Sequence, residues 1–345
     1  MRKLLLCTSA LVLLGALNSR AQDTATIVGT VTDTTGAVIP GAKVTVSNPD
    51  KGYIRNLAAN SEGIYQAPAL PIGDYTVIAE TAGFRKLTRS GIALTAGQVQ
   101  RVDLQLQVGL TTEEVTVTGN LPHVQTETAA ISDVVTGSQI SNLELNGRNF
   151  VALAALVPGA TPDNGQDNTH LGLAANIGLS FNGARMEYNN WEIDEGMNND
   201  DTSGGNSMNT WPSLDSIAEF RIFTSTYGAD KGKHAGANVE VVTKSGTKQF
   251  HGSAYEYVRN DTFDANDWFA NRQIAPPGGN APKTPLKRND YGYTIGGPFY
   301  IPSHYNTDKS KTFFFWSNEW RKDREGTVIS NNVPSLRMRD GDFSE

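Results

Sequence analysis

Residues 22–108 consist of short segments in which apolar and polar residues alternate, the period-two pattern of a half-buried β-strand. Turn-forming pairs such as Pro40-Gly41 and Gly73-Asp74 separate these segments at intervals of roughly eight to twelve residues. This spacing predicts an all-β domain, a β-sandwich of about seven strands. The apolar positions expected in its core are Ala42, Val44, Val46, Tyr75, Val77, Ala79, Val102, Leu104 and Leu106.

The middle of the chain mixes helical and strand patterns. Ser138 is a suitable N-cap for a helix that ends at Leu145, and Asn149 can cap a second helix from Phe150 to Val157. Apolar segments over 220–224 and 239–243 are bounded by Gly-rich turns and predict strands. Helices and strands that intermingle in this way indicate a mixed α/β domain.

Residues 247–345 contain alternating segments that are rich in aromatic residues. Tyr291, Tyr293 and Ile295 would share one face of a strand, with small or polar residues on the other. Strands of outer-membrane barrels alternate lipid-facing and lumen-facing residues and carry aromatic residues near both interfaces. We therefore predict the first strands of a transmembrane β-barrel. The other aromatic residues that support this prediction are Tyr255, Tyr257, Phe314, Trp316 and Trp320.

The N-terminus has the pattern of a secretory signal peptide. Arg2 and Lys3 precede a long apolar run, and small residues stand at the positions required for cleavage after Ala21. A membrane anchor is the alternative, but the apolar run is short for a spanning helix. Cleavage would remove Cys7, the single cysteine, so that the mature chain has neither disulfides nor thiol chemistry.

The net charge is −7 and is unevenly distributed. The segment 111–246 holds six basic and seventeen acidic residues, a net charge of −11, and its neighbours are nearly neutral. Proteins that bind nucleic acids need a basic face for the phosphates, and no segment provides one. We therefore exclude a nucleic-acid partner.

Residue spacings give no sign of an enzyme. The five histidines do not form an H-E-x-x-H pair, and no G-x-S-x-G nucleophile motif occurs. We therefore expect no catalytic residue, no metal site and no cofactor. An acidic cluster in the middle of the chain lacks the spacing of an EF-hand and is interpreted as a solvated loop. Its residues are Asp194, Glu195, Asn198, Asn199, Asp200 and Asp201.

A short extended segment, "GLTTEEVTVTGNLP", follows the sandwich. It has two readings: a free strand that pairs with the edge of a partner's sheet, or a last sandwich strand or plain linker. Periodicity alone favours the second reading. The residues concerned, which we call the box-like segment, are Glu113, Glu114, Val115, Thr116, Val117 and Thr118.

Several phrases of the sequence resemble known families. "VGTVTDTTGAVIPGAKVTV" and "SEGIYQAPALPIGDYTVIAETAGF" resemble the carboxypeptidase regulatory-like domain, a prealbumin-like sandwich. "SFNGARMEYNNWEIDEGMNNDD" and "LDSIAEFRIFTSTYGADKGKHAGANVEVVTKSGT" resemble the plug of TonB-dependent outer-membrane receptors of the Oar-like type. "YTIGGPFYIP" and "KTFFFWSNEWRK" resemble the start of the Oar-like barrel. By its position before the plug, the box-like segment resembles a TonB box.

The resemblance implies an organisation and a function. It implies energised uptake across the outer membrane, with the box-like segment contacting the C-terminal domain of TonB in the periplasm. The other implied partners are outer-membrane lipid and an extracellular ligand, for which carbohydrate and peptide are candidates. The acidic loop would face this extracellular ligand. The implied parts are a signal peptide (1–21), the sandwich (22–108), a linker with the box-like segment (109–124), the plug (125–246) and the start of the barrel (247–345).

Two further expectations follow. Single-chain bacterial barrels have at least eight strands, and about three or four are visible, so we expect a truncated receptor that does not transport by itself. The alternative function is a secreted or surface sandwich module that binds carbohydrate or protein. Tyr53, Tyr65 and Phe84 could then stack on a sugar, although core and turn packing is the favoured reading.

Overall fold

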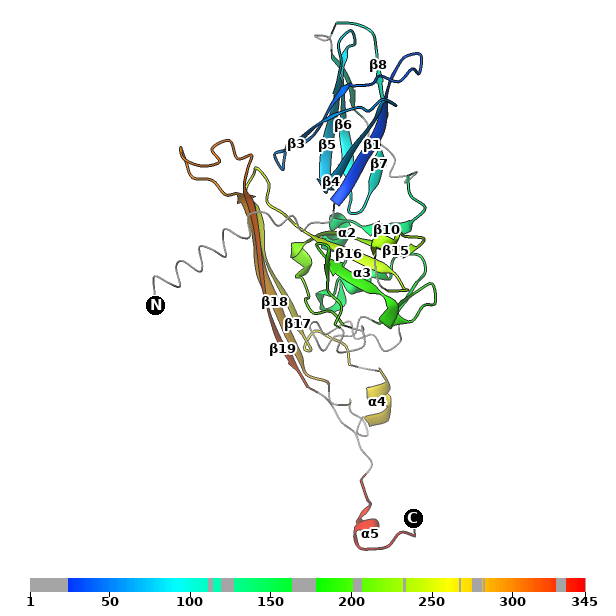
Figure 1. The fold of residues 1–345 in the computed structure, drawn as a ribbon. Helices are drawn as coiled ribbons and strands as arrows, with labels where there is room; N and C mark the ends of the chain where they lie inside the picture. The colour runs from blue at the N-terminus through cyan, green and yellow to red at the C-terminus, as the bar shows by residue number, and fades with distance from the viewer. Residues whose placement is uncertain are drawn as a thin grey trace, which may run out of the picture. The chain divides into compact units, whose positions relative to one another are not determined.

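The computed structural model describes most of the chain in two compact units, which we treat separately (Figure 1). One unit comprises residues 1–251 and 296–315, and the other comprises 252–295 and 316–345. Ala21 and the predicted signal peptide, Glu113 and Asp201 lie outside the described residues. The described residues are 24–110, 114–118, 127–162, 178–200, 207–231, 234–266, 268–274, 281, 283–326 and 333–344. No helix in these ranges is long and apolar enough to cross a membrane.

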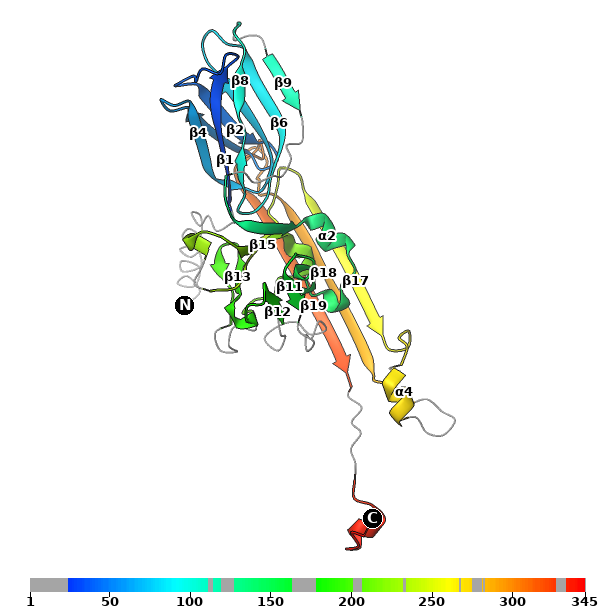
Figure 2. The ribbon, with the colours of Figure 1, turned by 90° about the vertical axis from the view of Figure 1, so that its right-hand side faces the viewer.

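The N-terminal part is a β-sandwich, as predicted (Figure 2). Its smaller sheet has the order β4-β1-β7, with β8 also paired to β1, and its larger sheet has the order β3-β2-β5-β6-β9. Most neighbours are antiparallel, whereas β7 and β8 run parallel to β1, and β9 runs parallel to β6. The strand bounds are β1 (Thr24–Asp33), β2 (Lys43–Asn48), β3 (Tyr53–Ala58), β4 (Ile64–Pro71), β5 (Gly73–Glu80), β6 (Lys86–Leu94), β7 (Val99–Arg101), β8 (Leu104–Leu106) and β9 (Glu114–Thr118).

The sandwich core confirms the alternation predicted from the sequence. Every expected core position is buried, and strands such as β2 alternate buried and more exposed residues along their length. Complete burial of an aliphatic side chain contributes roughly 1.5–3 kcal/mol, so this shared core holds the two sheets together. Tyr65 is buried and its hydroxyl donates to the Val102 carbonyl at 2.6 Å, while Tyr53 and Phe84 pack against the same core. The packing reading of these aromatic residues is therefore confirmed.

A separate five-stranded sheet lies in the central region, by which we mean the described residues between 127 and 246. Its order is β10-β15-β16-β13-β14, and a separate pair joins β11 and β12. Phe150 lies at the centre of the core and packs edge-to-face against Trp191, Trp211 and Phe220. The strand bounds are β10 (Ile131–Val135), β11 (Ala160–Pro162), β12 (Leu179–Phe181), β13 (Asn190–Ile193), β14 (Gly196–Met197), β15 (Ile217–Ser225) and β16 (Asn238–Thr243).

The helices of the central region are short, and their starts differ from the prediction. Thr136, and not Ser138, caps α2 (Gly137–Asn142), because its side chain and that of Gln139 form a reciprocal capping box. The helix ends at Asn142 and does not continue to Leu145. The second helix, α3 (Val151–Ala154), is shorter than expected, although the Asn149 side chain does accept a hydrogen bond from the Val151 amide. Single 3-10 turns complete the region: η2 (Asn146–Arg148), η3 (Met186–Tyr188), η5 (Leu214–Ser216) and η6 (Ala229–Lys231).

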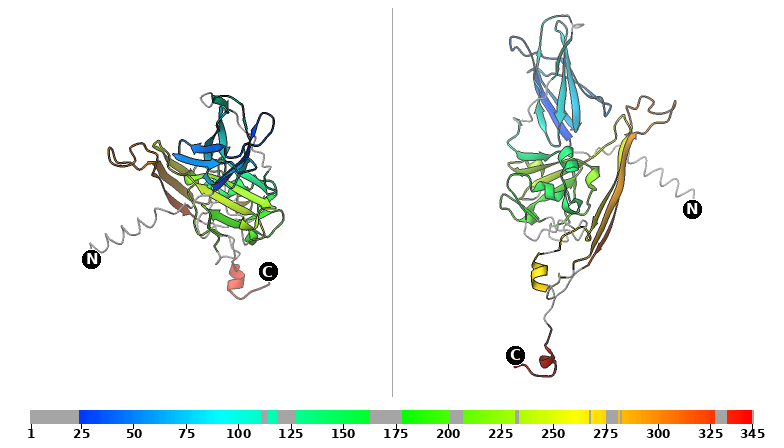
Figure 3. Two further views of the ribbon diagram at one scale, coloured as in Figure 1. Left: turned by 45° about the horizontal axis from the view of Figure 1, so that its top comes forward. Right: turned by 180° about the vertical axis from the view of Figure 1, so that it is seen from behind.

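The C-terminal part contains a sheet of three long strands with the order β17-β18-β19, seen from two further directions in Figure 3. On β18, buried and more exposed residues alternate as the sequence predicts, with Tyr293 and Ile295 exposed and Thr294 buried between them. The elements are β17 (His251–Asn260), α4 (Trp268–Ile274), β18 (Leu286–Pro298), β19 (Phe313–Glu325) and α5 (Leu336–Arg339).

One face of this sheet carries a ladder of polar contacts between strands. Arg321 Nε donates to Asp290 Oδ1 at 2.7 Å, and Arg288 Nε donates to Asp323 Oδ2 at 2.9 Å. Each is a charge-assisted hydrogen bond, which is stronger than a neutral one. The Tyr255 hydroxyl extends the ladder through a bond to Glu319 Oε2 of 2.8 Å. Charged residues therefore bind one another across adjacent strands on this face.

Aromatic side chains of the same sheet form a second cluster. The ring of Trp320 stacks on Tyr291 with a centroid distance of 5.6 Å and lies 6.1 Å from the ring of Tyr293. Trp316 and Trp320 are both about half exposed. Large aromatic residues rarely remain exposed together on a protein that water surrounds completely. The sheet thus has a charged face and an aromatic one.

Candidate functional site: strand β9 and the contact between sandwich and central region

Residues Glu114–Thr118 of the box-like segment form β9, the last strand of the larger sandwich sheet. Strand β9 lies alongside β6 in parallel, with Glu114 opposite Lys86 and Thr116 opposite Thr88. Val115 lies opposite Leu87 and packs against the sandwich core. Of the two readings of this segment, the structure therefore shows the last sandwich strand. Binding of the segment to another protein remains a prediction.

Two side chains of β6 hold the first residue of β9. Thr88 Oγ1 donates to Glu114 Oε1 at 2.6 Å, and Lys86 Nζ lies 3.7 Å from the same oxygen. The hydrogen bond from Thr88 and the charge of Lys86 together lower the pKa of the exposed Glu114 carboxyl. Glu114 therefore stays ionised and paired at neutral pH. The contact fixes the register of β9 at its N-terminal end.

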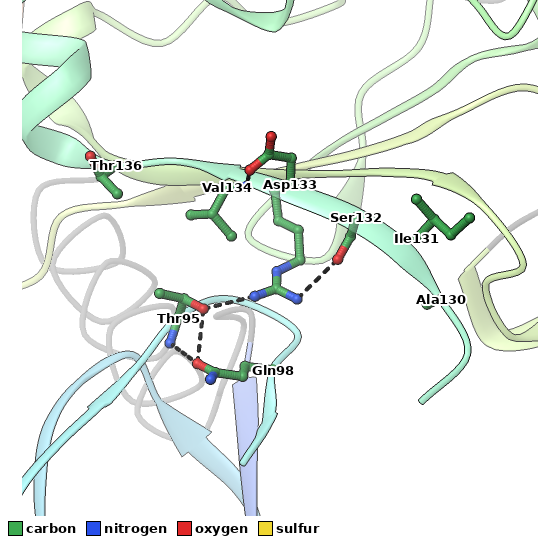
Figure 4. Close-up of a pocket in the computed structure, with 9 residues that line it drawn as sticks. Thr95, Gln98, Ala130, Ile131, Ser132, Asp133, Val134 and Thr136 are labelled. Atoms are coloured by element: carbon green, nitrogen blue, oxygen red, sulfur yellow. Dashed lines mark hydrogen bonds between the residues drawn. The ribbon is translucent and has the colours of Figure 1, made fainter. Parts of the chain in front are cut away.

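Strand β6 leads directly into a loop that contacts the central region. We call Thr95–Gln98 the docking loop. Thr95 Oγ1 accepts a hydrogen bond from Arg221 Nη2 at 2.8 Å and donates one to Gln98 Oε1 at 2.9 Å. The second guanidinium nitrogen of Arg221 donates to Ser132 Oγ at 3.2 Å. Arg221 thus joins the sandwich to strands β10 and β15 beside a cavity of about 430 Å³ (Figure 4).

The rest of the docking loop is packed closely against the same sheet. The Ala96 amide donates to Glu219 Oε1, and Ala96 is buried in a small apolar cluster with Ile72 and Val242. Gly97 has a φ of +59°, and a Cβ atom there would lie 3.0 Å from the ring of Phe223. Both the left-handed backbone and this close approach favour glycine. Apolar packing and hydrogen bonds therefore act together in this contact.

The contact buries charged groups of both signs. Arg221 is only 4% exposed, and burial lowers its pKa, while Glu219, Glu240 and Asp133 oppose that shift. Burial raises the pKa values of Glu219 and Glu240 and lowers that of Lys51. Acidic neighbours already compensate the guanidinium, so the arrangement suits an interface and not an anion site. Among the described residues, no three His, Cys, Asp or Glu side chains gather as metal ligands would.

The acidic loop differs from its interpretation as a solvated segment. Asn198, Asn199 and Asp200 are 5%, 2% and 7% exposed. The Asn199 side chain accepts from the Trp191 amide at 2.8 Å and donates to a backbone carbonyl, and Asn198 makes a similar pair of bonds. Both carboxylate oxygens of Asp194 accept hydrogen bonds from Thr243. The expectation of a solvated loop is therefore wrong for these three buried residues, and the side chains of Asn198 and Asn199 serve internal hydrogen bonds.

Sequence reasoning did not identify the docking loop or the residues that receive it. One signal was present: Glu219 and Arg221 interrupt an otherwise apolar strand, β15, at alternate positions on one face. Charged residues in such a strand are rarely buried without a partner. The partner lies more than a hundred residues away in the sequence, and no local pattern points to it.

Two regions of the chain match models of known protein families. Residues 26–107 match the family model of the carboxypeptidase regulatory-like domain. Residues 242–345 match that of an outer membrane beta barrel domain. The chain therefore combines a regulatory-like sandwich with sequence of an outer-membrane barrel.

The particular resemblance is to the Oar-like TonB-dependent receptors. The chain is 27% identical to the TonB-dependent transporter Oar of Myxococcus xanthus over 94% of its own length. It spans 31% of the length of that relative. The resemblance stated from the sequence is confirmed, and this relative is a transporter.

Solved structures show weaker likenesses. The siderophore receptor PirA of Acinetobacter baumannii is 16% identical, with a TM-score of 0.36 over 50% of this chain and 22% of that one. A catechol 1,2-dioxygenase of Acinetobacter radioresistens is 19% identical, with a TM-score of 0.23 over 28% of this chain and 58% of that one. Neither likeness is strong enough to inform function.

Proposed function

We propose that this chain carries the sandwich, the plug and the first barrel strands of a TonB-dependent outer-membrane receptor for energised substrate uptake. The observation that carries the proposal is the similarity to the transporter Oar over 94% of the chain, which includes all of these regions. The match of residues 242–345 to an outer-membrane barrel model supports the same placement. The protein would act without chemical change to its ligand.

Each region has a role in this proposal. Strand β9 carries the contact with the C-terminal domain of TonB, because an extended strand can pair with a partner's sheet through backbone hydrogen bonds. The central region acts as the plug. The three-stranded sheet forms part of the barrel wall, with the aromatic cluster around Trp320 toward lipid and the charged ladder around Arg321 toward the lumen. The ligand itself is not specified by these regions.

The experiment is a binding assay between the full chain and a purified TonB C-terminal domain. Proline at Val115 or Val117 removes a backbone donor, and each such change should weaken binding about tenfold, or by roughly 1.4 kcal/mol. Threonine at the same two positions keeps the N–H group and the β-branched shape, so V115T and V117T are the matched controls. Absence of binding by the unaltered chain would refute the proposal.

A fractionation experiment tests the placement independently. The chain should sediment with outer membranes and be released by detergent. Recovery of the folded chain from the medium would instead favour a secreted sandwich module.

A further inference from the structure

Strand β9 has two edges, and among the strands that the structure describes only β6 pairs with it. The order β3-β2-β5-β6-β9 places β9 at the end of the sheet, with β6 on one side. Strand edges present unpaired N–H and C=O groups that can receive another strand. Glu114 and Thr116 are exposed, and Val117 is 43% exposed. A partner strand can therefore reach the outer edge of β9 while β6 still occupies the inner edge.

The inner edge of β9 is anchored by side chains as well as by the backbone. Glu114 is paired with Thr88 and Lys86, and Val115 contacts the sandwich core. Val117 lines the same cavity, of about 240 Å³, as Arg89, its register partner on β6. Removal of β9 from the sheet would break all of these contacts together. Pairing at the outer edge breaks none of them.

We propose that the sandwich presents β9 to TonB as an already extended strand and remains attached to it in the complex. The inference rests on the proposed function, and it adds that the sandwich is part of the TonB-binding surface. A docked strand has lost its backbone freedom before binding, which removes the entropic cost of ordering it from the association step. The partner's strand would extend the sandwich sheet beyond β9.

Attachment to the sandwich also provides a mechanical connection. Strand β6 pairs with β9 and continues into Thr95, which is hydrogen-bonded to Arg221 of the central region. A pull on the outer edge of β9 would therefore be transmitted through the sheet to the docking loop. The alternative, in which TonB strips β9 from β6, would leave the docking loop outside the path of the force.

A disulfide lock separates these two arrangements. Arg89 and Val117 are register partners and line one cavity, so a R89C/V117C pair should cross-link β9 to β6 under mild oxidation, in a chain in which Cys7 is replaced by Ser. The matched control is R89C/T116C, because Thr116 points to the other face of the sheet and should not cross-link. Failure of the first pair to cross-link would overturn the docking of β9.

Binding of the TonB C-terminal domain to the locked chain then distinguishes attachment of β9 from its release. We expect the oxidised and reduced R89C/V117C chains to bind within about twofold of each other, since the outer edge is free in both. Loss of binding on oxidation, restored by a reductant, would show that β9 must leave β6 and would overturn the inference. The proposed function would survive that outcome, whereas it fails if the unaltered chain does not bind at all.

A charge reversal on β6 tests, without introduced cysteines, whether the sandwich presents β9 to TonB. K86E places a negative charge beside Glu114, and it should weaken TonB binding about fivefold and increase hydrogen exchange at the amides of β9. K43E is the control, because Lys43 makes a similar exposed pair with Glu80 elsewhere in the same sheet. Tighter binding of K86E than of K43E would indicate that β6 sequesters β9, and it would overturn the inference.

Discussion

Replacement of Arg221 by Met tests the contact between the sandwich and the central region. The guanidinium is 4% exposed and makes hydrogen bonds of 2.8 Å to Thr95 and 3.2 Å to Ser132. Methionine keeps much of the apolar volume but removes both bonds and the positive charge. Glu219 and Glu240, which are buried nearby, would each lose one of two compensating charges, because Lys51 still acts on Glu219 and Lys231 still pairs with Glu240.

The expected loss can be worked out from these contacts. A hydrogen bond to a charged group contributes about 1.5–3 kcal/mol, and removal of one member of a buried charge cluster costs about 3–5 kcal/mol. The two figures describe overlapping effects and do not add, and R221M no longer carries the desolvation cost of burying the guanidinium. We therefore expect R221M to lower the free energy of unfolding of this contact by about 3 kcal/mol. R221K keeps the charge, but its single nitrogen has no forked geometry to serve both hydroxyls, so its loss should be about half as large.

Hydrogen exchange of the full chain, followed peptide by peptide, measures this effect. In R221M, protection should fall by about a hundredfold or more at the docking loop and β10, while the sandwich core around Tyr65 should keep its protection. A decrease in the opening free energy of less than about 1 kcal/mol at both segments would contradict the expected role of Arg221, because its side chain would then contribute no more than an exposed charged residue. A uniform loss across the whole sandwich would show instead that the two regions unfold as one.

Three further predictions concern single groups. Burial raises the pKa of Glu219, so the folded protein binds a proton at this carboxyl more tightly than the unfolded chain does. Stability should therefore fall as the pH rises from below 4.5 through the raised pKa. In a series of melting curves at different pH values, E219Q should reduce this dependence of stability on pH. Y65F should cost about 1 kcal/mol in denaturant unfolding through loss of the bond to Val102, and no loss would show that the carbonyl finds water instead. T136A should cost about 1 kcal/mol and expose the amides of α2 to exchange, whereas S138A, at the position expected from the sequence, should cost less than half of that.

The regions of the fold were largely determined by local pattern. Period-two alternation identified the sandwich core at Val44, Val77 and Leu104, because a strand with one buried face must place apolar residues at every second position. The same rule separated the aromatic and polar faces of β18. The helix start at Thr136 was misplaced by two residues, since both Thr136 and Ser138 can cap a helix and the choice depends on which of them pairs with Gln139.

The roles of several polar residues became visible only in the folded chain. Its sequence pattern predicts that the box-like segment is extended, but the place of β9 on the edge of β6 depends on Lys86 and Thr88, more than twenty residues away. Likewise, Asn198 and Asn199 looked solvated and are buried, because backbone carbonyls ten and twelve residues away accept hydrogen bonds from their amides. Arg221 is the clearest case: a charge in an apolar strand becomes stable only when a loop from another region supplies its partner. Such long-range compensation has no local period, which is why the sequence pattern located strands of the sandwich core, whereas the contact through Arg221 is visible only in the folded chain.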